Sequence, residues 1–385
     1  MRAIAGVMTA LALAGAQAAP ALAKPLFPPA EAEAIPVLLL TDLGSGRDLA
    51  ARQPDLAFVP ASMTKVMTAK VAFREIAAGR LDRKALLTVP DALAREWNGK
   101  GTSLYLKGGE KVTVDRLLTA ITTVSANDAA MVLASHHAGS ITGWTTLMNR
   151  EAARLGMASS RFATPTGWPD NGATHVSARD LVRLSRALID EHPFDYRRYF
   201  GRRSLTVNGS ELRNRDPVTG VVAGADGIKT GHTREAGYNF LGSAERADTR
   251  LVMVVAGARS AAERASASRA LLEWGFAAWQ RQPLFRAGDV VAAARVQGGN
   301  ARQVDLVATR PLHASWQGGA EPGTRLVLHY RGPLQPPIAK GAQVAELEIR
   351  TSDGGTGRVP LVTAHAVGRA GPLDRLVNGL IGLFS

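Results

Sequence analysis

Hydrophobic periodicity near the start of the chain predicts a buried strand followed by a helix. Residues 35–41 (IPVLLLT) form an apolar run, and the DLGSG that follows is rich in turn-forming residues, which predicts a strand leading into a hairpin. Residues 62–78 carry apolar side chains at near-helical spacing, and Gly79 is well placed to end a helix. Those side chains are Met63, Val66, Met67 and Phe73.

Helical and strand-like segments continue through the following part of the chain. Residues 115–156 are rich in Ala, Leu and Met and predict several helices, and residues 176–191 predict another. Residues 225–243 read as a strand-like run interrupted by glycines, and residues 250–258 contain LVMVV, which is typical of a buried strand. Residues 261–279 predict a closing helix. Because the strands cluster at the two ends of this region, we expect an α+β fold whose termini contribute adjacent strands.

The pattern changes near Gln282-Pro283, where helical periodicity gives way to a period of two. Short apolar runs are now separated by Gly, Pro and Asn, which indicates a small all-β domain. We therefore expect an α+β domain over residues 30–280 and a β-rich domain over residues 284–368. The runs that predict its strands are residues 289–296, 304–308, 325–330, 344–350 and 357–363.

The two ends of the chain follow neither pattern. Residues 1–23 place Arg2 before an apolar run and then small residues, which is the order of a secretory signal peptide, and the run is too short to span a bilayer. Residues 371–385 predict a short amphipathic helix that lies at a membrane surface, with a helix docked on the protein itself as the alternative. Its apolar stripe consists of Leu373, Leu376, Val377, Leu380, Ile381 and Leu383. We expect an exported, periplasmic protein attached peripherally to the inner membrane.

Composition excludes several classes of chemistry. The 385 residues include no cysteine, so a disulfide framework, a thiolate zinc site and a cysteine nucleophile are all ruled out. The formal net charge of +13 comes from dispersed basic residues without a dense Lys/Arg run, so a solvated basic surface explains it most simply. As a partner, an anionic cell envelope is favoured over nucleic acid. The eight histidines show no metal-ligand spacing, so we expect neither a metal nor another cofactor.

The first candidate catalytic motif is Ser62-Met-Thr-Lys65. Positions i and i+3 lie on one face of a helix, so the Ser62 hydroxyl and the Lys65 amine can come within hydrogen-bonding reach. A serine hydroxyl becomes an effective nucleophile when a neighbouring base accepts its proton. Lysine can be that base only if burial or a second cation lowers its pKa. By itself this tetrapeptide is a weak signal.

Two further motifs supply candidate partners for the first. Ser125-Ala-Asn127 begins a helical stretch, where Ser125 can relay a proton and Asn127 can donate to a substrate carbonyl and hold Lys65. An ordinary helix N-cap is the alternative interpretation of this motif. Lys229-Thr230-Gly231 combines a cation and a hydroxyl, which can bind a carboxylate, with a glycine that allows a ligand close to a strand. Lys229 would also be the second cation that lowers the pKa of Lys65.

The order of the three motifs is more informative than any one of them. S-x-x-K, then S-x-N about 60 residues later, then K-T-G about 100 residues further on, is the signature of the active-site serine penicillin-recognising enzymes. The chain resembles the D-alanyl-D-alanine carboxypeptidase family of low-molecular-mass penicillin-binding proteins. PASMTK at 60–65, SANDA at 125–129, DGIKTGHT at 226–233 and LLEWGF at 271–276 carry the resemblance. Ala126 stands where that family often has glycine.

This resemblance implies a fold and a mechanism. The fold would be a β-lactamase/transpeptidase-like domain, with an antiparallel sheet flanked by helices, followed by a small all-β domain and a membrane-anchor helix. The enzyme would remove the terminal D-alanine from peptidoglycan stem pentapeptides through an acyl-enzyme on Ser62, and β-lactam inhibitors would bind covalently. Lys65 would be the acylation base, assisted by Ser125 and Asn127. Substrate binding would involve Lys229, Thr230, Gly231, His232 and Arg264, with a weaker claim for Arg215.

The resemblance also implies an oxyanion hole made by the backbone N–H groups of Ser62 and His232. Three other functions remain open at this point. A serine β-lactamase shares the three motifs but needs an additional carboxylate for deacylation, which the sequence does not identify. A D,D-endopeptidase would cut crosslinks, although relatives of that kind usually lack the β-rich domain. A catalytically silent wall-binding protein would not need the intact Ser62 and Lys65.

Overall fold

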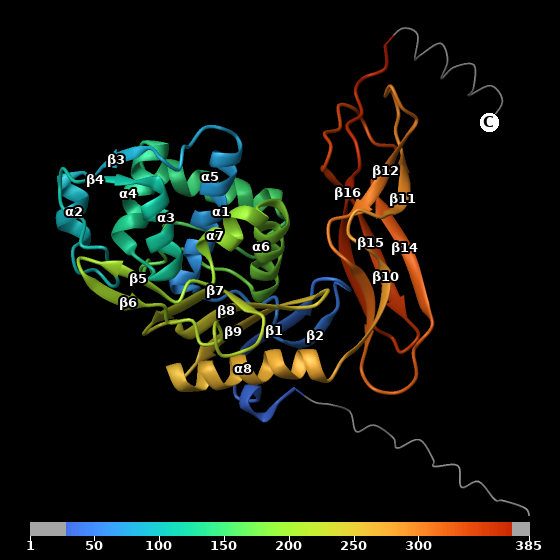
Figure 1. Ribbon diagram of the computed structural model, residues 1–385, viewed down its shortest axis with the longest axis horizontal. Helices are drawn as coiled ribbons and strands as arrows, with labels where there is room; N and C mark the ends of the chain where they lie inside the picture. Colours follow the sequence, from blue (N-terminus) through green and yellow to red (C-terminus); the bar gives the residue numbers. More distant parts are fainter. Residues whose placement is uncertain (1–27, 372–385) are drawn as a thin grey trace, which may run out of the picture.

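The apolar run near the start of the chain becomes the centre of a sheet that is buried on both faces. The computed structural model describes residues 28–371 (Figure 1). In strand β1 (Val37–Asp42), Val37 and Leu39 pack into one hydrophobic core, whereas Leu38 and Leu40 pack into a second core across the sheet. Successive side chains of a strand point to opposite faces, so a strand covered on both sides is an uninterrupted apolar run.

The first domain is built on a five-stranded antiparallel sheet in the order β2-β1-β9-β8-β7. The strands from the two ends of the domain, β1 and β9, are neighbours, which confirms the predicted arrangement. The run expected at residues 225–243 is two strands, because the chain turns after Thr233. Strand β7 occupies one edge of the sheet. The bounds are β2 (Asp48–Arg52), β7 (Ala225–Thr233), β8 (Gly237–Arg246) and β9 (Thr249–Ala258).

Helices cover both faces of this sheet (Figure 1). Helix α8 (Ala261–Ala277) and the short 3-10 helix η1 (Ala30–Ala32) lie on one face, and the other helices lie on the opposite side. Those helices are α1 (Thr64–Ala77), α2 (Asp91–Trp97), α3 (Val114–Thr123), α4 (Asn127–Ala138), α5 (Ile141–Arg154), α6 (Ala178–Glu191) and α7 (Pro193–Tyr199). Two hairpins complete the domain: β3 (Leu86–Thr88) with β4 (Lys111–Thr113), and β5 (Ser204–Val207) with β6 (Ser210–Arg213).

No helix within residues 28–371 is long and apolar enough to cross a membrane.

The second domain is all β. A five-stranded antiparallel sheet in the order β11-β12-β16-β15-β14 is accompanied by the two-stranded pair β10-β13. The five runs predicted from period-two alternation correspond to the strands of the larger sheet. The strands β10 and β13 were not predicted, because β10 contains a proline and β13 (LHASW) buries His313 and Ser315 among its apolar residues. The bounds are β10 (Gln280–Phe285), β11 (Val290–Arg295), β12 (Gln303–Ala308), β13 (Leu312–Trp316), β14 (Thr324–Tyr330), β15 (Gln343–Thr351) and β16 (Thr356–Thr363).

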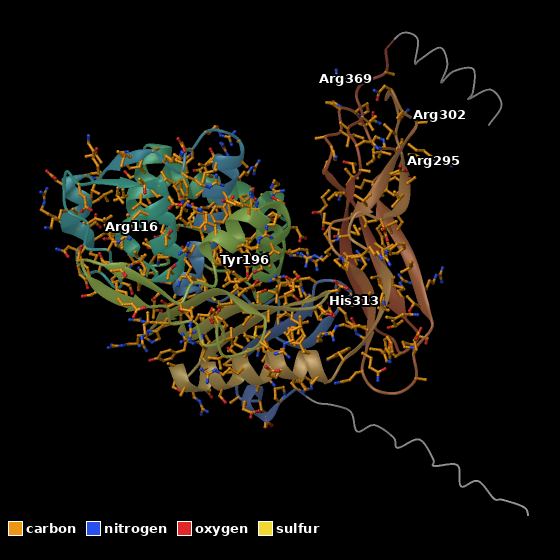
Figure 2. All side chains as sticks on the ribbon, viewed as in Figure 1. Arg116, Tyr196, Arg295, Arg302, His313 and Arg369 are labelled. Carbon is orange, nitrogen blue, oxygen red and sulfur yellow. The ribbon has the colours of Figure 1, made fainter. Side chains whose placement is uncertain are left out.

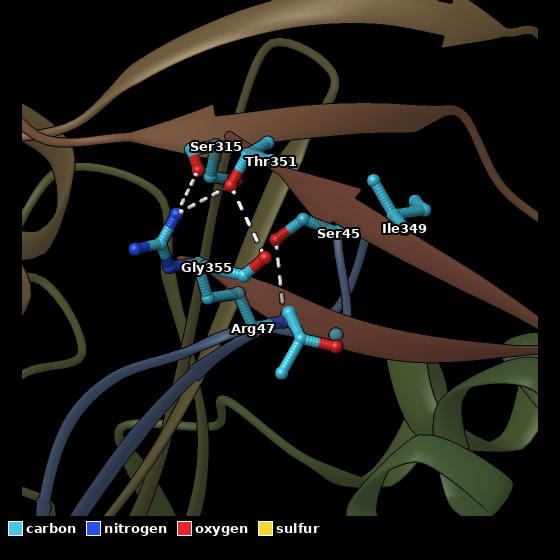
Figure 3. Close-up of a pocket in the computed structure, with 8 residues that line it drawn as sticks. Ser45, Arg47, Ser315, Ile349, Thr351 and Gly355 are labelled. Carbon is cyan, nitrogen blue, oxygen red and sulfur yellow. Dashed lines mark hydrogen bonds between the residues drawn. The ribbon is translucent and has the colours of Figure 1, made fainter. Parts of the chain in front are cut away.

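The polar residues of β13 join the two domains. His313 Nε2 lies 2.8 Å from an oxygen of Asp42, which is fully buried at the end of β1, and Arg281 Nε donates to the same carboxylate at 2.9 Å. Figure 2 shows His313 at this junction. Beside it, Arg47 Nη1 donates to the Ser315 carbonyl at 2.6 Å (Figure 3). Burial raises the pKa of Asp42, but His313 and Arg281 outweigh this effect and lower it. The second domain is therefore held on the first by a buried charge cluster.

Two predicted segments lie outside the described residues. The signal peptide at residues 1–23 is one of them. The amphipathic helix is the other, because only Gly371 of residues 371–385 is described.

Candidate active site

A short 3-10 turn places the predicted nucleophile beside the predicted base. Ser62 lies in this turn, η2 (Ala61–Met63), which leads into α1, so the expected helix at 62–78 begins as a 3-10 turn. Side chains at i and i+3 are nearly aligned in such a turn. As a result, Lys65 Nζ lies 3.0 Å from Ser62 Oγ. Ser62 is half-buried and reachable from solvent, whereas Lys65 is 1% exposed.

The environment of Lys65 favours a neutral amine. Burial, and then the charge of Lys229, lower the pKa of Lys65 well below its usual value, while Asp128 acts in the opposite direction. The Lys65 amine also donates to the Thr166 carbonyl at 2.7 Å. A neutral amine can keep that bond and still offer its lone pair to the Ser62 hydroxyl. The geometry therefore equips Lys65 to accept a proton from Ser62.

The K-T-G motif lies on the edge strand β7, next to the nucleophile. Lys229 is 4% exposed, and its ammonium donates to the Thr230 carbonyl at 3.0 Å. Burial, followed by the charges of Arg264 and Arg215, lowers the pKa of Lys229 to about 7. Lys229 is therefore the second cation that the sequence predicted beside Lys65. The positive charges of Arg264 and Arg215 act on Lys229 in turn.

Two glycines permit the close packing of this region around Ala61. A side chain at Gly231 would place its Cβ 2.3 Å from the Pro60 carbonyl oxygen, so β7 could not approach the nucleophile turn with any other residue. On another side, a Cβ at Gly167 would lie 1.8 Å from the Ala61 carbonyl oxygen, and the φ of Gly167 is +71°. Both positions require glycine, because a side chain at either one would collide with a backbone carbonyl of the nucleophile turn.

Arginines concentrate positive charge beyond Lys229. Arg264, on α8, is 6% exposed, and its Nη2 donates to the Arg215 carbonyl at 3.4 Å. Its Nε is buried and has no hydrogen-bond partner among the described residues. The Arg264 guanidinium lies 5.9 Å from the ring of Tyr238, which packs at 4.0 Å against the exposed His232. Unpartnered donors and excess cations are what a carboxylate ligand would satisfy.

The S-x-N motif lies at the start of α4 in an unusual backbone conformation. Ser125 has a φ of +68°, and Ala61, which precedes the nucleophile, has a φ of +49°. Non-glycine residues rarely adopt such values, and those that do cluster at functional sites. Asn127 Nδ2 donates to the Lys100 carbonyl at 2.8 Å, and no hydrogen bond joins Asn127 to Lys65 among the described residues. This hydrogen bond connects the start of α4 to the loop that contains Lys100.

Two contributors to the site escaped the sequence analysis: the segment 164–168, which includes Trp168, and Asp128. The segment 164–168 supplies the Thr166 carbonyl and the close contact at Gly167, yet its proline and glycine indicate only a turn. Asp128 accepts hydrogen bonds from the Leu104 and Leu106 amides, and its charge acts on Lys65. Trp168 is 39% exposed, and it lies beside Asn127 across Gly101.

Comparison with known proteins agrees with this geometry. The family described as D-alanyl-D-alanine carboxypeptidase (peptidase S11) matches residues 27–260, and the penicillin-binding protein 5 C-terminal domain matches residues 279–369. D-alanyl-D-alanine carboxypeptidase DacD of Salmonella typhimurium is 34% identical over 380 residues, which cover 97% of this chain and 96% of that protein.

Solved structures give the same answer. Penicillin-binding protein 5 from Haemophilus influenzae has a TM-score of 0.71 and 28% identity, and the match covers 89% of this chain and all of that one. Penicillin-binding protein D2 from Listeria monocytogenes in its ampicillin-bound form has a TM-score of 0.57 and 29% identity, covering 63% of this chain and 97% of that one. The chain therefore belongs to the D-alanyl-D-alanine carboxypeptidase family, as its motifs predicted, and carries the C-terminal domain of penicillin-binding protein 5.

Proposed function

We propose that this protein is a serine D-alanyl-D-alanine carboxypeptidase that removes the terminal D-alanine from peptidoglycan stem pentapeptides. The observation that carries the proposal is the 3.0 Å approach of the buried Lys65 amine to the Ser62 hydroxyl, beside the cation of Lys229. The site therefore combines a serine with a base whose pKa is lowered, which is the arrangement that nucleophilic catalysis needs.

In the first half of the reaction, Ser62 Oγ attacks the carbonyl carbon of the D-Ala–D-Ala amide while its proton moves to Lys65 Nζ. The backbone N–H groups of Ser62 and His232 donate to the developing oxyanion. The C–N bond then breaks, and the proton passes to the departing amine, with Ser125 as the relay. Terminal D-alanine leaves, and the remaining peptide stays on Ser62 as an ester.

In the second half, water attacks the ester and the bond to Ser62 Oγ breaks. A stem peptide with a new terminal carboxylate is released, and Ser62 regains its proton. The edge position of β7 supports this scheme, because the unpaired side of an edge strand can align an extended peptide. The same nucleophile would open the ring of a β-lactam and remain acylated.

Labelled penicillin tests the nucleophile. We expect stoichiometric labelling of the wild-type protein, peptide mapping of the label to Ser62, and no labelling of Ser62→Ala. A label on another residue, or undiminished labelling of the variant, would remove Ser62 from the mechanism.

Product analysis tests the reaction class. A pentapeptide should lose one D-alanine, whereas a crosslinked peptide dimer should remain intact. Release of monomers from the dimer would identify a D,D-endopeptidase, and rapid turnover of penicillin would identify a β-lactamase.

We further propose that the protein is exported and acts at the outer face of the inner membrane. The proposal rests on the signal-like residues 1–23 and on the apolar stripe in residues 371–385. A chain that ends before Gly371 should fractionate as a soluble and fully active enzyme. Identical fractionation of the full and truncated chains would instead favour a helix docked on the protein.

A further inference from the structure

Among the residues that the structure describes, three segments at one end of the β-rich domain contain arginines and no aspartate or glutamate. Three segments meet there: residues 295–302, 331–338 and 365–371. β-bridges join them, pairing Val296 with Leu334, Gly299 with Arg369, and Ile338 with Val367. We call these three segments the basic tip. Because bridges and buried apolar side chains hold the segments together, their charges are displayed on one ordered surface.

The basic tip contains four arginines and neither aspartate nor glutamate. All four are exposed, and none forms an ion pair within residues 28–371. They are Arg295, Arg302, Arg331 and Arg369, and Figure 2 shows three of them at the end of the domain, near the last described residues. Along β12, the first carboxylate after Arg302 is Asp305, whose backbone carbonyl accepts a hydrogen bond from the Ala364 amide.

Several other arginines of the same domain pair with carboxylates. Arg281 pairs with Asp42, Arg310 with Asp190, and Arg350 with Glu348. These pairs stabilise the domain junction or the large sheet. The arginines of the basic tip have no such role, so their charge is available to an external partner.

The sequence that follows the basic tip indicates the kind of partner. The described part of the chain ends at Gly371, in the basic tip, and the sequence continues with the apolar positions of residues 372–385. Positive charge next to an apolar segment matches a membrane surface, where arginines meet lipid phosphates while apolar side chains enter the interface. Arginine suits this role because its planar guanidinium can contact two phosphate oxygens at once.

We propose that the basic tip is a second membrane contact, which binds the anionic phospholipid headgroups of a bilayer. This inference extends the proposed membrane attachment and is independent of the peptidase chemistry. Two contacts would also limit how the molecule tilts on the membrane, because the charge cluster of Asp42, His313 and Arg281 holds the two domains together.

The test uses the full chain with vesicles of phosphatidylcholine alone or with phosphatidylglycerol added. Arg295, Arg302 and Arg369 are changed together to glutamine. Each basic residue near an anionic surface contributes roughly fivefold in affinity, so the triple variant should bind the anionic vesicles roughly 100-fold more weakly. Its salt dependence should also be shallower, whereas binding to phosphatidylcholine should not change.

The matched control removes three exposed arginines from helices of the first domain. Arg95, Arg150 and Arg197 form no ion pairs within the described residues, so their change to glutamine gives the same net charge. This control should lose less than about threefold in affinity, because charges away from the surface are screened by salt. Equal losses in the two triple variants would mean that net charge alone acts, and would overturn the proposal.

Three further readouts complete the test. Changing the same three tip arginines to lysine should preserve most of the binding. Penicillin labelling should be equal in all variants, so that a defect in the active site is recognised separately. Inorganic phosphate should displace the protein no better than sodium chloride of equal ionic strength. Stronger displacement by phosphate, or no preference of the wild type for anionic vesicles, would overturn the bilayer assignment.

Discussion

Helix α1 carries two buried lysines in opposite electrostatic environments. Lys65 faces Ser62 and the Thr166 carbonyl, with the cation of Lys229 nearby. Lys70, five residues later and therefore about 140° around the helix, ion-pairs with Glu151 at 3.1 Å and with Glu191 at 2.7 Å. Both side chains are excluded from solvent, at 1% and 0% exposure.

The two environments have opposite consequences. Around Lys70, hydrogen bonding from Arg154 and the charge of Lys70 outweigh the effect of burial and lower the pKa of Glu151 to about 2. This region is neutralised by pairing. Around Lys65, burial and then the charge of Lys229 lower the pKa of the amine, and the carboxylate of Asp128 offsets them only in part. Burial by itself does not make a lysine reactive; the sign of the neighbouring charge decides whether the lysine serves structure or chemistry.

The largest difference should appear when each lysine is changed to methionine. In Lys65→Met, the base is absent, and the rate of acylation by labelled penicillin should fall roughly 100- to 10,000-fold. The free energy of unfolding should hold or rise, because methionine fills this buried position with an apolar side chain and removes the cost of keeping an amine away from water. Urea titration and a labelling time course measure the two effects. Near-normal acylation would exclude Lys65 as the base.

The same substitution at Lys70 should damage stability and spare the chemistry. In Lys70→Met, Glu151 is left with fewer partners in a buried site, which costs about 3–5 kcal/mol for a broken buried pair. We expect the lower end, because Arg74 and Arg154 still bind Glu151. The labelling rate per folded molecule should stay near that of the wild type. If labelling fell as far as in Lys65→Met, the two environments would not be functionally distinct.

A smaller effect should separate carboxylate recognition from acylation. Arg264→Ala should lower kcat/KM on D-Ala-D-Ala peptides by about ten- to a hundredfold, or about 1.5–3 kcal/mol, while labelling of Ser62 persists. A peptide with an amidated terminus should be a poor substrate for both proteins, with little further loss in the variant.

Arg269→Ala is the matched control on α8, because Arg269 donates to the Pro217 carbonyl and supports the same loop. If this control, or the amidated substrate, showed the same loss, Arg264 would support the loop and would not read the carboxylate.

The smallest expected effect is a shift in the pH dependence of acylation. Below about pH 7, Lys229 is charged and lowers the pKa of Lys65. Lys229→Met removes that charge, so the pKa of Lys65 rises, and the acid limb of the acylation rate should move to higher pH. Lys229→Arg keeps the charge and should leave the limb in place or lower it. An unmoved acid limb in Lys229→Met would show that the charge of Lys229 does not lower the pKa of Lys65.

Local sequence patterns predicted the parts of this protein that depend on neighbouring residues. The S-x-x-K spacing places Ser62 beside Lys65 because one turn of helix brings positions i and i+3 together. The apolar run at residues 35–41 predicted a buried strand, and period-two alternation predicted the five strands of the larger β sheet in the second domain. The ordered motifs also identified the family before any distance was known.

Other features depend on contacts between distant segments. The Thr166 carbonyl reaches Lys65 from 101 residues away, and His313 reaches Asp42 from 271 residues away. Periodicity along the chain carries no information about such pairs, so β13 and the hydrogen bond from Asn127 to Lys100 were not predicted. The sequence identified the groups that we propose carry the chemistry. Only the tertiary structure decided which buried lysine meets a cation and which meets carboxylates, because charge interactions depend on proximity in space and not on order along the chain.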